Sequence, residues 1–250
     1  MVETVTLYRA PTTVADADAL ADWLRDRIDA EVRVRDRLLG AVDDTLAEEF
    51  AAARVTDPHE QSTGNTMTGI VRYEERALAS PERAGGIVYD GRAVQRALNA
   101  RLSEQSLDHL HVPLLDRVVG TWGDHDGRWH KRVAVLGQPT LLSVPGLYEA
   151  PAKPEAYYEA KSKHALMTGD TPPREVLEAD VDGDFLVADD PRTTDALKGY
   201  LLAAVDFLDT GSAFCDDERC RLHDAHRQPG VVRAQLRDPA FCEAHGERYG

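Results

Sequence analysis

All three cysteines of the 250-residue chain lie in its C-terminal segment, and a histidine follows the last of them. Four residues separate Cys215 from Cys220, twenty-one separate Cys220 from Cys242, and two separate Cys242 from His245. A tetrahedral zinc ion is commonly bound by two such pairs of soft or borderline ligands, each pair closed by a short turn. The spacing therefore predicts one zinc ion. Because four protein ligands leave no open position, we expect this zinc to be structural.

Two other interpretations of this segment stay open. His223 and His226 lie between the two ligand pairs, so either could replace His245 as the fourth ligand. The same two histidines could form a second site with a carboxylate such as Asp224, or they could be ordinary hydrogen-bonding loop residues. The cysteines themselves could be buried and inert, as free cysteines often are.

A second group of histidines lies in the middle of the chain, with acidic residues beside it: His109, His111, His125 and His130, with Asp108, Asp124 and Asp126. His109 and His111 would share one face of an extended strand. The group could bind a displaced metal ion, or it could form a polar strand edge and hairpin loops. Trp122 and Trp129 flank a Gly- and Asp-rich turn, so we expect a hairpin in which the tryptophans are packing residues.

Other common catalytic patterns are missing from the sequence. There is no G-x-S-x-G nucleophile motif, no phosphate-binding P-loop and no dinucleotide fingerprint. If zinc engages the three cysteines, a thiol nucleophile is excluded as well.

The charge composition is strongly acidic. Asp and Glu number 44 against 29 Lys and Arg, which gives a formal net charge of -15, and 24 of the basic residues are arginine. This composition is similar to that of proteins from salt-loving archaea, where salt screens the repulsion, although an ordinary acidic protein is the alternative. Broad nucleic-acid binding is disfavoured. The exception is an Arg-rich stretch of the C-terminal segment, which could contact RNA or an acidic protein, or could form surface ion pairs: Arg219, Arg221, Arg227, Arg233 and Arg237.

The first residues alternate apolar and polar side chains and predict a strand rather than a secretory signal. The apolar stretches are too short to span a membrane. We therefore predict a cytoplasmic protein, a compartment in which disulfides are disfavoured.

Strand and helix patterns alternate along the chain and predict an α/β or α+β fold. A helix is expected from about Val14 to Ile28, capped by the Pro11-Thr12-Thr13 stretch, and another from about Asp43 to Arg54. The segment 86–89 is predicted to form a strand, which leads into a helix that ends near Leu102. The stretch 109–146 is strand-rich, and a long helix follows Asp190-Pro191 and continues to Leu208. We divide the chain into an α/β portion, 1–190, and a helix plus zinc-binding portion, 191–250, which we expect to form one integrated domain.

The spacing of the C-terminal ligands resembles that of archaemetzincins. That family's motif is H-E-x-x-H-x-x-G-x-x-H-C, followed by x4, by C-x-M and later by C-x-x-C. Its three histidines bind a catalytic zinc, and its four cysteines bind a structural one. Aligned without a gap, the motif places its glycine on Gly211, its first cysteines on Cys215 and Cys220, and its last pair on Cys242 and His245.

The departures from the motif concern the catalytic zinc. Its three histidine positions fall on Ala204, Leu208 and Phe214, the general-base position falls on Val205, and the methionine falls on Leu222. None of the first four side chains can bind a metal or abstract a proton. The resemblance therefore implies a metzincin-like mixed sheet with helices and a C-terminal structural zinc, without the catalytic zinc.

This resemblance leads to a prediction of function. We expect a zinc-binding, catalytically inactive protein that acts as a binding or assembly factor with a macromolecular partner. The alternative is a metallopeptidase or other hydrolase with a relocated metal site, around His109, His111 and His130 or around His223 and His226.

Overall fold

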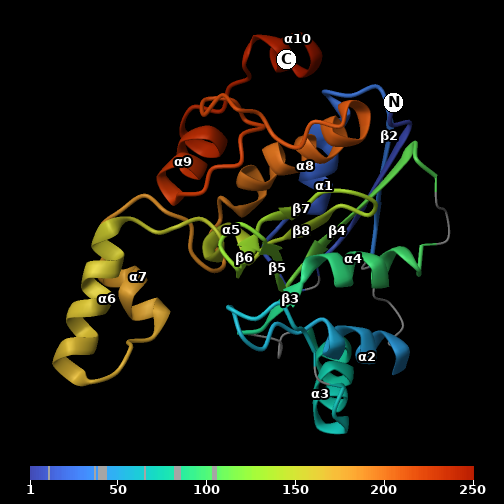
Figure 1. Ribbon diagram of the computed structural model, residues 1–250. Coiled ribbons are helices and arrows are strands. Elements are labelled where there is room, and N and C mark those ends of the chain that lie inside the picture. The colour runs from blue at the N-terminus through green and yellow to red at the C-terminus, as the bar shows by residue number, and fades with distance from the viewer. Residues whose placement is uncertain (11, 37, 39–43, 65, 82–85, 103–105) are drawn as a thin grey trace.

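The computed structural model describes residues 1–10, 12–36, 38, 44–64, 66–81, 86–102 and 106–250 (Figure 1). A five-stranded sheet forms its centre, with strand order β2-β1-β4-β8-β7. Its strands are β1 (Thr4–Tyr8), β2 (Glu31–Arg35), β4 (His109–Leu115), β7 (Ala134–Val135) and β8 (Leu141–Ser143). Strands β2, β1, β4 and β8 run parallel to one another, and β7 is antiparallel to β8.

A smaller sheet has the order β3-β5-β6. It consists of β3 (Val88–Asp90), β5 (Val118–Gly123) and β6 (Arg128–Arg132). Strands β5 and β6 form the expected hairpin, in which Trp122 lies opposite Trp129 and the two rings meet edge to face at 5.8 Å. The turn signals between the two tryptophans therefore predicted this element correctly.

Ten α-helices surround the sheets in the described part of the chain. They are α1 (Ala17–Arg25), α2 (Asp44–Ala52), α3 (Thr68–Ala79), α4 (Gly91–Asn99), α5 (Gly146–Glu149), α6 (Glu155–Thr168), α7 (Arg174–Asp180), α8 (Thr193–Thr210), α9 (Gln228–Val232) and α10 (Glu243–Tyr249). A π-helical turn, η2 (Arg233–Arg237), follows α9 directly.

Helices α1 and α8 pack together against one face of the central sheet (Figure 1). Val5 and Leu7 of β1 and Leu110 and Val112 of β4 are completely buried in the core that these helices cover. Because side chains alternate along a strand, the intervening residues of β1 and β4 face the other way. Buried residues from both ends of the chain, Val2 and Tyr249 among them, belong to this one core.

A second hydrophobic core lies between the smaller sheet and helices α2, α3 and α4. Phe50 and Tyr89 form its aromatic centre, with their rings 5.6 Å apart. Apolar residues of β4, β7 and β8 also belong to this core, so it lies against one edge of the central sheet.

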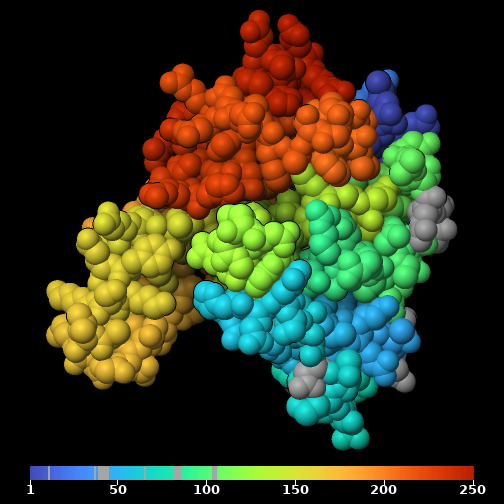
Figure 2. Space-filling model, in the orientation of Figure 1, coloured from blue at the N-terminus to red at the C-terminus, as the bar shows by residue number. Residues whose placement is uncertain are grey.

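Helices α6 and α7 form an arm that projects from the body of the molecule (Figures 1 and 2). Tyr157 is the buried residue of α6, and Leu177 is the buried residue of α7. The arm is attached through Lys153, whose ammonium group donates to Glu178 at 3.0 Å and to the carbonyl of Leu186 at 2.6 Å. An aromatic contact adds to this attachment, since the rings of Tyr157 and Phe185 lie 6.4 Å apart.

Several predicted boundaries need correction. The first helix begins at Ala17 and not near Val14, because Asp16 is its N-cap and accepts hydrogen bonds from the amides of Asp18 and Ala19. The Asp43 start predicted for the second helix lies outside the described residues. The strand predicted at 86–89 is β3, shifted towards the C-terminus, and the helix after it ends at Asn99. No described helix is long and apolar enough to cross a membrane.

Candidate metal centre

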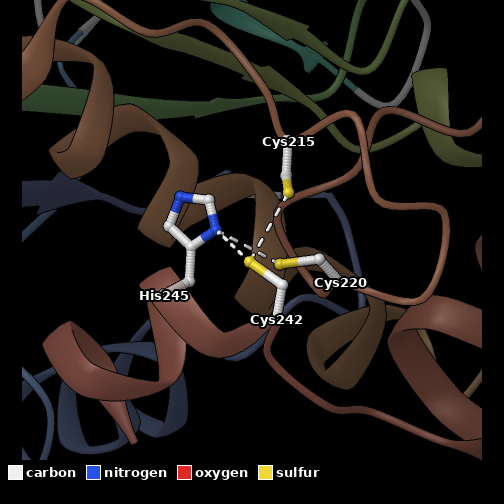
Figure 3. A group of neighbouring side chains, drawn as sticks. All are labelled: Cys215, Cys220, Cys242 and His245. Carbon is white, nitrogen blue, oxygen red and sulfur yellow. Dashed lines mark hydrogen bonds between the residues drawn. The ribbon is translucent and has the colours of Figure 1, made fainter.

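Cys215, Cys220, Cys242 and His245 converge on one point (Figure 3). Cys215 and Cys220 lie in the loop that follows the long helix α8. Cys242 is the N-cap residue of α10, and His245 lies in the first turn of that helix. The two pairs thus come from segments on either side of α9 and η2, as the spacing predicted.

The distances within this group fit a tetrahedral zinc site. Zn–S bonds of about 2.3 Å and Zn–N bonds of about 2.0 Å place two sulfur ligands about 3.8 Å apart and a sulfur and a nitrogen about 3.5 Å apart. The Sγ atoms of Cys215 and Cys242 are 3.8 Å apart, and His245 Nδ1 lies 3.5 Å from Cys220 Sγ and 3.0 Å from Cys242 Sγ. All four ligand atoms lie within 4.8 Å of one another. These residues would bind a zinc ion with little rearrangement.

Backbone hydrogen bonds fix the loop that carries the first pair. The amide of Cys215 donates to the carbonyl of Leu222 at 3.1 Å, and the amide of Arg221 donates to the carbonyl of Ala240 at 2.7 Å. Cys220 also forms a parallel bridge with Ala240, two residues before Cys242. The fold therefore joins the two ligand pairs through main-chain contacts.

The chemistry of the thiols also favours a metal. All three cysteines are free. Burial raises the pKa of Cys215 to about 12 and raises that of Cys220 as well. A zinc ion binds thiolates and deprotonates coordinating thiols outright, so it would supply the positive charge that these buried groups lack.

Sequence reasoning missed the residue that stands behind His245. Asp206 of α8 is 4% exposed, and one of its carboxylate oxygens lies 3.7 Å from His245 Nε2. The other oxygen accepts hydrogen bonds from Arg248 Nη1 at 2.9 Å and from the Tyr249 hydroxyl at 2.8 Å. A carboxylate beside the distal nitrogen of a metal-binding histidine orients the ring and raises its basicity. The signal was an acidic residue within the apolar stretch of a buried helix.

The other two candidate ligands point elsewhere. His223 Nδ1 lies 2.8 Å from the carbonyl oxygen of Cys215, a contact with the backbone. His226 lines a surface cleft with residues of β6. Among the described residues, neither histidine belongs to the Cys/His group, so the geometry favours His245 as its fourth member.

The positions that the archaemetzincin motif assigns to the catalytic zinc lie on and just beyond α8. Ala204 and Val205 are 0% and 2% exposed and belong to the main core, and Leu208 and Phe214 pack against it. Gly211 ends the helix with a φ of 79°, a left-handed conformation that favours glycine. The aligned glycine thus has a definite backbone role, whereas the aligned ligand positions are apolar packing residues.

The central histidines divide into two groups, so the single four-histidine site that we considered is wrong for the described residues. His109 and His111 share one face of β4, as predicted, with their rings 4.0 Å apart. They contact strand β1, where His109 Nε2 lies 2.9 Å from Thr6 Oγ1 and His111 Nδ1 lies 2.9 Å from the Tyr8 hydroxyl. They are buried hydrogen-bonding residues of the sheet.

His125 and His130 meet Asp126 at the tip of the β5–β6 hairpin. Asp126 Oδ1 lies 2.9 Å from His130 Nε2 and 3.6 Å from His125 Nε2. A Cβ atom at Gly123 would lie 2.6 Å from that carboxylate oxygen and 2.8 Å from His130 Nε2. Two histidines and a carboxylate can bind a transition metal and leave positions open. The group borders a cleft of about 680 Å³ that His59 and His226 also line.

The Arg-rich stretch is largely engaged within the protein. Arg221 is 9% exposed and its guanidinium group lies 5.0 Å from the Trp23 ring. Burial, followed by the charge of Arg27, lowers the pKa of Arg221 to about 10. Arg233 forms an ion pair with Glu218, and Arg237 forms one with Asp184. These contacts favour the ion-pair interpretation of the stretch.

Comparison with solved structures places the fold among zinc peptidases. A zinc-dependent peptidase from Methanocorpusculum labreanum (strain Z) matches with a TM-score of 0.50 and 10% sequence identity, over 98% of each chain. Archaemetzincin from Methanopyrus kandleri matches with a TM-score of 0.48 and 11% identity, over 98% of this chain and 92% of that chain. The predicted α/β fold class is confirmed. The chain belongs to the family of unknown function DUF7001, whose model matches residues 6–248. No curated protein matches it significantly.

Proposed function

We propose that the protein is a zinc-stabilised relative of the zinc peptidases that does not hydrolyse peptides and acts as a binding or assembly factor. The observation that carries this proposal is the apolar character of two side chains of α8. Where the archaemetzincin motif has the first zinc-binding histidine and the general base, this chain has the buried Ala204 and Val205.

The missing groups are the ones that peptide hydrolysis requires. A catalytic zinc lowers the pKa of a bound water and polarises the carbonyl, while a carboxylate transfers the protons. Apolar side chains at these positions can do neither, and in α8 they contribute instead to the core. The C-terminal zinc, with four protein ligands, has no position for a substrate.

Metal analysis combined with a peptidase assay tests this proposal. We expect about one zinc per chain, bound by the four C-terminal ligands. We also expect that a mixed peptide library is cleaved no faster than by protein treated with a metal chelator. A matched archaemetzincin should cleave under the same conditions and serves as the positive control. Hydrolysis that requires zinc and persists in highly purified protein would contradict the proposal.

The arm of α6 and α7 is the surface that we assign to a protein partner. Tyr158, Leu166, Met167 and Val176 on this arm are 46%, 88%, 77% and 44% exposed. Large exposed apolar side chains that gather on one projecting element are typical of a protein contact. We infer that the partner presents an apolar patch to the arm.

A pair of matched variants tests the role of the arm. Leu166→Glu should abolish cross-linking to a partner captured by the wild-type protein from its native cells, because a charge would enter an apolar interface. Leu107→Glu is the control, since Leu107 is also 88% exposed and lies outside the arm. Equal loss of the partner in both variants, or in neither, would contradict the assignment.

A second function, a hydrolase with a relocated metal, is favoured by His125, Asp126 and His130. Their open arrangement beside a cleft of about 680 Å³ could activate a water molecule. In that case the protein should bind two zinc ions, and His130→Ala should lose one of them. A total of one zinc, unchanged by His130→Ala, would exclude this alternative.

A further inference from the structure

A cleft unrelated to the metal groups lies at the carboxyl ends of three parallel strands. Thr12 and Thr13 follow β1, Asp116 and Arg117 follow β4, and Pro145 follows β8. Two adjoining cavities, of about 250 and 480 Å³, lie here and share Asp116, Pro145 and Tyr148. Cavities of this size accommodate small molecules.

The topology makes this edge the expected place for a ligand. The strand order is β2-β1-β4-β8, so the chain leaves β1 towards β2 on one side and leaves β4 towards β8 on the other. Open α/β sheets bind ligands outside the carboxyl ends of their strands, where the strand order reverses in this way. The loops after β1 and β4 meet at this point, since the Thr12 hydroxyl donates to Asp116 Oδ2 at 3.1 Å.

Arg117 brings a buried cation to the wall of the larger cavity. Its side chain is 3% exposed, and its Nη1 donates to the Tyr89 hydroxyl at 2.9 Å and lies 3.6 Å from the Glu74 carboxylate. Among the described residues, its Nε has no hydrogen-bond partner, and the carboxylate oxygen of Asp116 is 3.9 Å away. A buried donor without an acceptor is destabilising, so an acceptor in the cavity would be favoured.

The smaller cavity has a similar unpartnered group. The Oγ1 atom of Thr13 is buried and has no hydrogen-bond partner. On the opposite wall, Asp189 has a φ of 56°, a left-handed conformation that among the described residues other than glycine is found at this position alone. Strained backbone clusters at functional sites, although aspartate adopts this conformation more readily than most residues.

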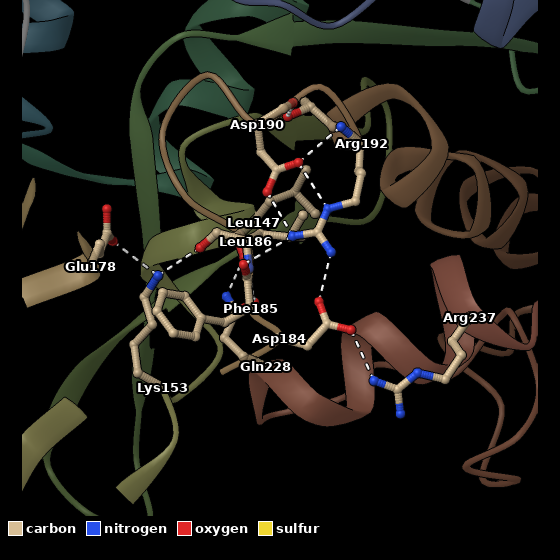
Figure 4. Close-up of polar contacts among 11 residues, drawn as sticks. Leu147, Lys153, Glu178, Asp184, Phe185, Leu186, Asp190, Arg192, Gln228 and Arg237 are labelled. Atoms are coloured by element: carbon tan, nitrogen blue, oxygen red, sulfur yellow. Dashed lines mark hydrogen bonds and ion pairs between the residues drawn. The ribbon is translucent and has the colours of Figure 1, made fainter. Parts of the chain in front are cut away.

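The loop that carries Asp189 is firmly held (Figure 4). Arg192 binds both oxygens of the Asp190 carboxylate, at 3.0 and 2.9 Å, and also binds Asp184 at 2.6 Å. The Thr193 hydroxyl donates to the Asp190 carbonyl at 2.6 Å. The wall of the cavity is thus preorganised, which reduces the entropy lost when a ligand binds.

We propose that this cleft, the switch-point cleft, binds a small molecule that carries an oxyanion next to hydroxyl groups. The oxyanion accepts a hydrogen bond from Arg117 Nε in the larger cavity, and a hydroxyl group of the ligand pairs with Thr13 Oγ1 in the adjoining smaller cavity. Arginine is suited to this role because its planar guanidinium group binds carboxylates and phosphates with several donors. The second arginine of the cleft, Arg174, lies 4.9 Å from the Tyr148 ring and forms an ion pair at 3.2 Å with Glu149, which lines the same cavity.

The carboxylate of Asp116 determines which other groups of the ligand can bind beside the oxyanion. Its carboxylate accepts one hydrogen bond from Thr12 and keeps further lone pairs for donors. A purely anionic ligand would be repelled there, whereas the hydroxyl groups of a sugar acid or a sugar phosphate can donate to it. The oxyanion can be a carboxylate or a phosphate, and experiment can distinguish the two.

Three probes test the proposal: ribose 5-phosphate, gluconate and neutral ribose, titrated at constant ionic strength by calorimetry and by thermal melting. Either ribose 5-phosphate or gluconate should bind with a 1:1 stoichiometry and raise the melting temperature, and the one that does identifies the oxyanion. Ribose should bind at least 10-fold more weakly, because it lacks the group that Arg117 contacts.

Variants localise the binding. Thr13→Val and Arg117→Lys should each weaken the affinity for the charged probe at least 5-fold, while Arg96→Lys, an exposed change on α4, should leave it unchanged. If Arg117→Lys does not fold, Thr13→Val alone decides. The proposal is overturned if neither charged probe binds, if ribose binds equally well, or if Thr13→Val binds the charged probe with wild-type affinity.

Discussion

At the scale of single residues, the position of His245 depends on contacts that reach well beyond its own helix. Its Nδ1 faces the cysteines while its Nε2 faces Asp206, so the ring has a defined orientation on both sides. Asp206 in turn connects α8 to Arg248 and Tyr249 of α10. The candidate zinc site is therefore supported by α8, the helix that also carries Ala204 and Val205.

Cys242→Ser should release the zinc. The free energy of zinc binding to structural sites is about 10 kcal/mol or more, and it is coupled to folding. Elemental analysis should show far less than one zinc per chain, and limited proteolysis should cut first between Cys220 and Cys242. His223→Ala is the control, because this histidine contacts a carbonyl group and should leave the zinc content unchanged. Full zinc content in Cys242→Ser would refute the assignment.

Asp206→Asn should weaken zinc binding without removing a ligand. Loss of a carboxylate that orients a metal-binding histidine typically lowers metal affinity about 10- to 100-fold. Competition with a chromophoric chelator measures this change. Asp209→Asn is the matched control on the same helix, since Asp209 contacts the amide of Val2 and not the histidine. Equal affinities in the two variants would show that Asp206 has no positioning role.

The sequence predicted the candidate zinc ligands but not the residues of the switch-point cleft. Three cysteines and a histidine at metal-ligand spacing predicted a group that the fold brings together, since local turns bring each pair together, and its zinc stays a prediction. The geometry favours the predicted His245 over the alternatives His223 and His226. The sequence left those alternatives open because the choice depends on how the loop folds back through the Cys220–Ala240 bridge. The switch-point cleft was also not predictable, because its residues come from three loops that are distant in the sequence.

At the scale of elements, the helix and strand patterns were informative, while local capping decided the boundaries. Pro11-Thr12-Thr13 had the composition of a cap for α1, yet Asp16 is the residue that accepts the amide hydrogen bonds. Asp90 similarly caps α4 and is also the last residue of β3. Several residues with capping side chains compete in such segments, and tertiary contacts select one of them. Thr12 instead donates to Asp116.

The loop before α8 should make stability depend on pH. Hydrogen bonds from Arg192 lower the pKa of Asp184, and although burial acts to raise the pKa of Asp190, its bonds to Arg192 lower it overall. A lowered folded-state pKa stabilises the protein above the ordinary aspartate pKa of about 3.9, and this contribution is lost as the pH falls towards the folded value.

Arg192→Gln should therefore lower the free energy of unfolding at neutral pH by about 1–3 kcal/mol, less than for a fully buried pair because the arginine is 39% exposed. Urea unfolding at neutral and acidic pH measures the effect. The difference between variant and wild type should shrink in acid. A difference that does not vary with pH would mean that the carboxylates are not responsible.

At the scale of the whole molecule, one hydrophobic core includes residues from the N-terminal strand, the long helix and the last helix. We infer that the portions 1–190 and 191–250 fold as one unit, since Val2 and Tyr249 are both buried in that core. The fold is similar to that of the zinc-dependent peptidase from Methanocorpusculum labreanum. Its ends are joined by ordinary packing and by the candidate zinc site together.

The net charge of -15 should make the stability of this unit depend on salt. Repulsion among the acidic side chains opposes the compact state, and the Debye length falls from about 10 Å at 0.1 M salt to about 3 Å at 1 M. The melting temperature should therefore rise with potassium chloride over this range. Sucrose at equal osmolarity is the control for general solute exclusion, which stabilises proteins without screening charge. Surface ion pairs such as Arg9–Asp18 oppose the trend, because salt weakens them, but each contributes little. A melting temperature that stays constant or falls with potassium chloride would show that repulsion does not limit stability, and would remove the basis for the resemblance to proteins of salt-loving archaea.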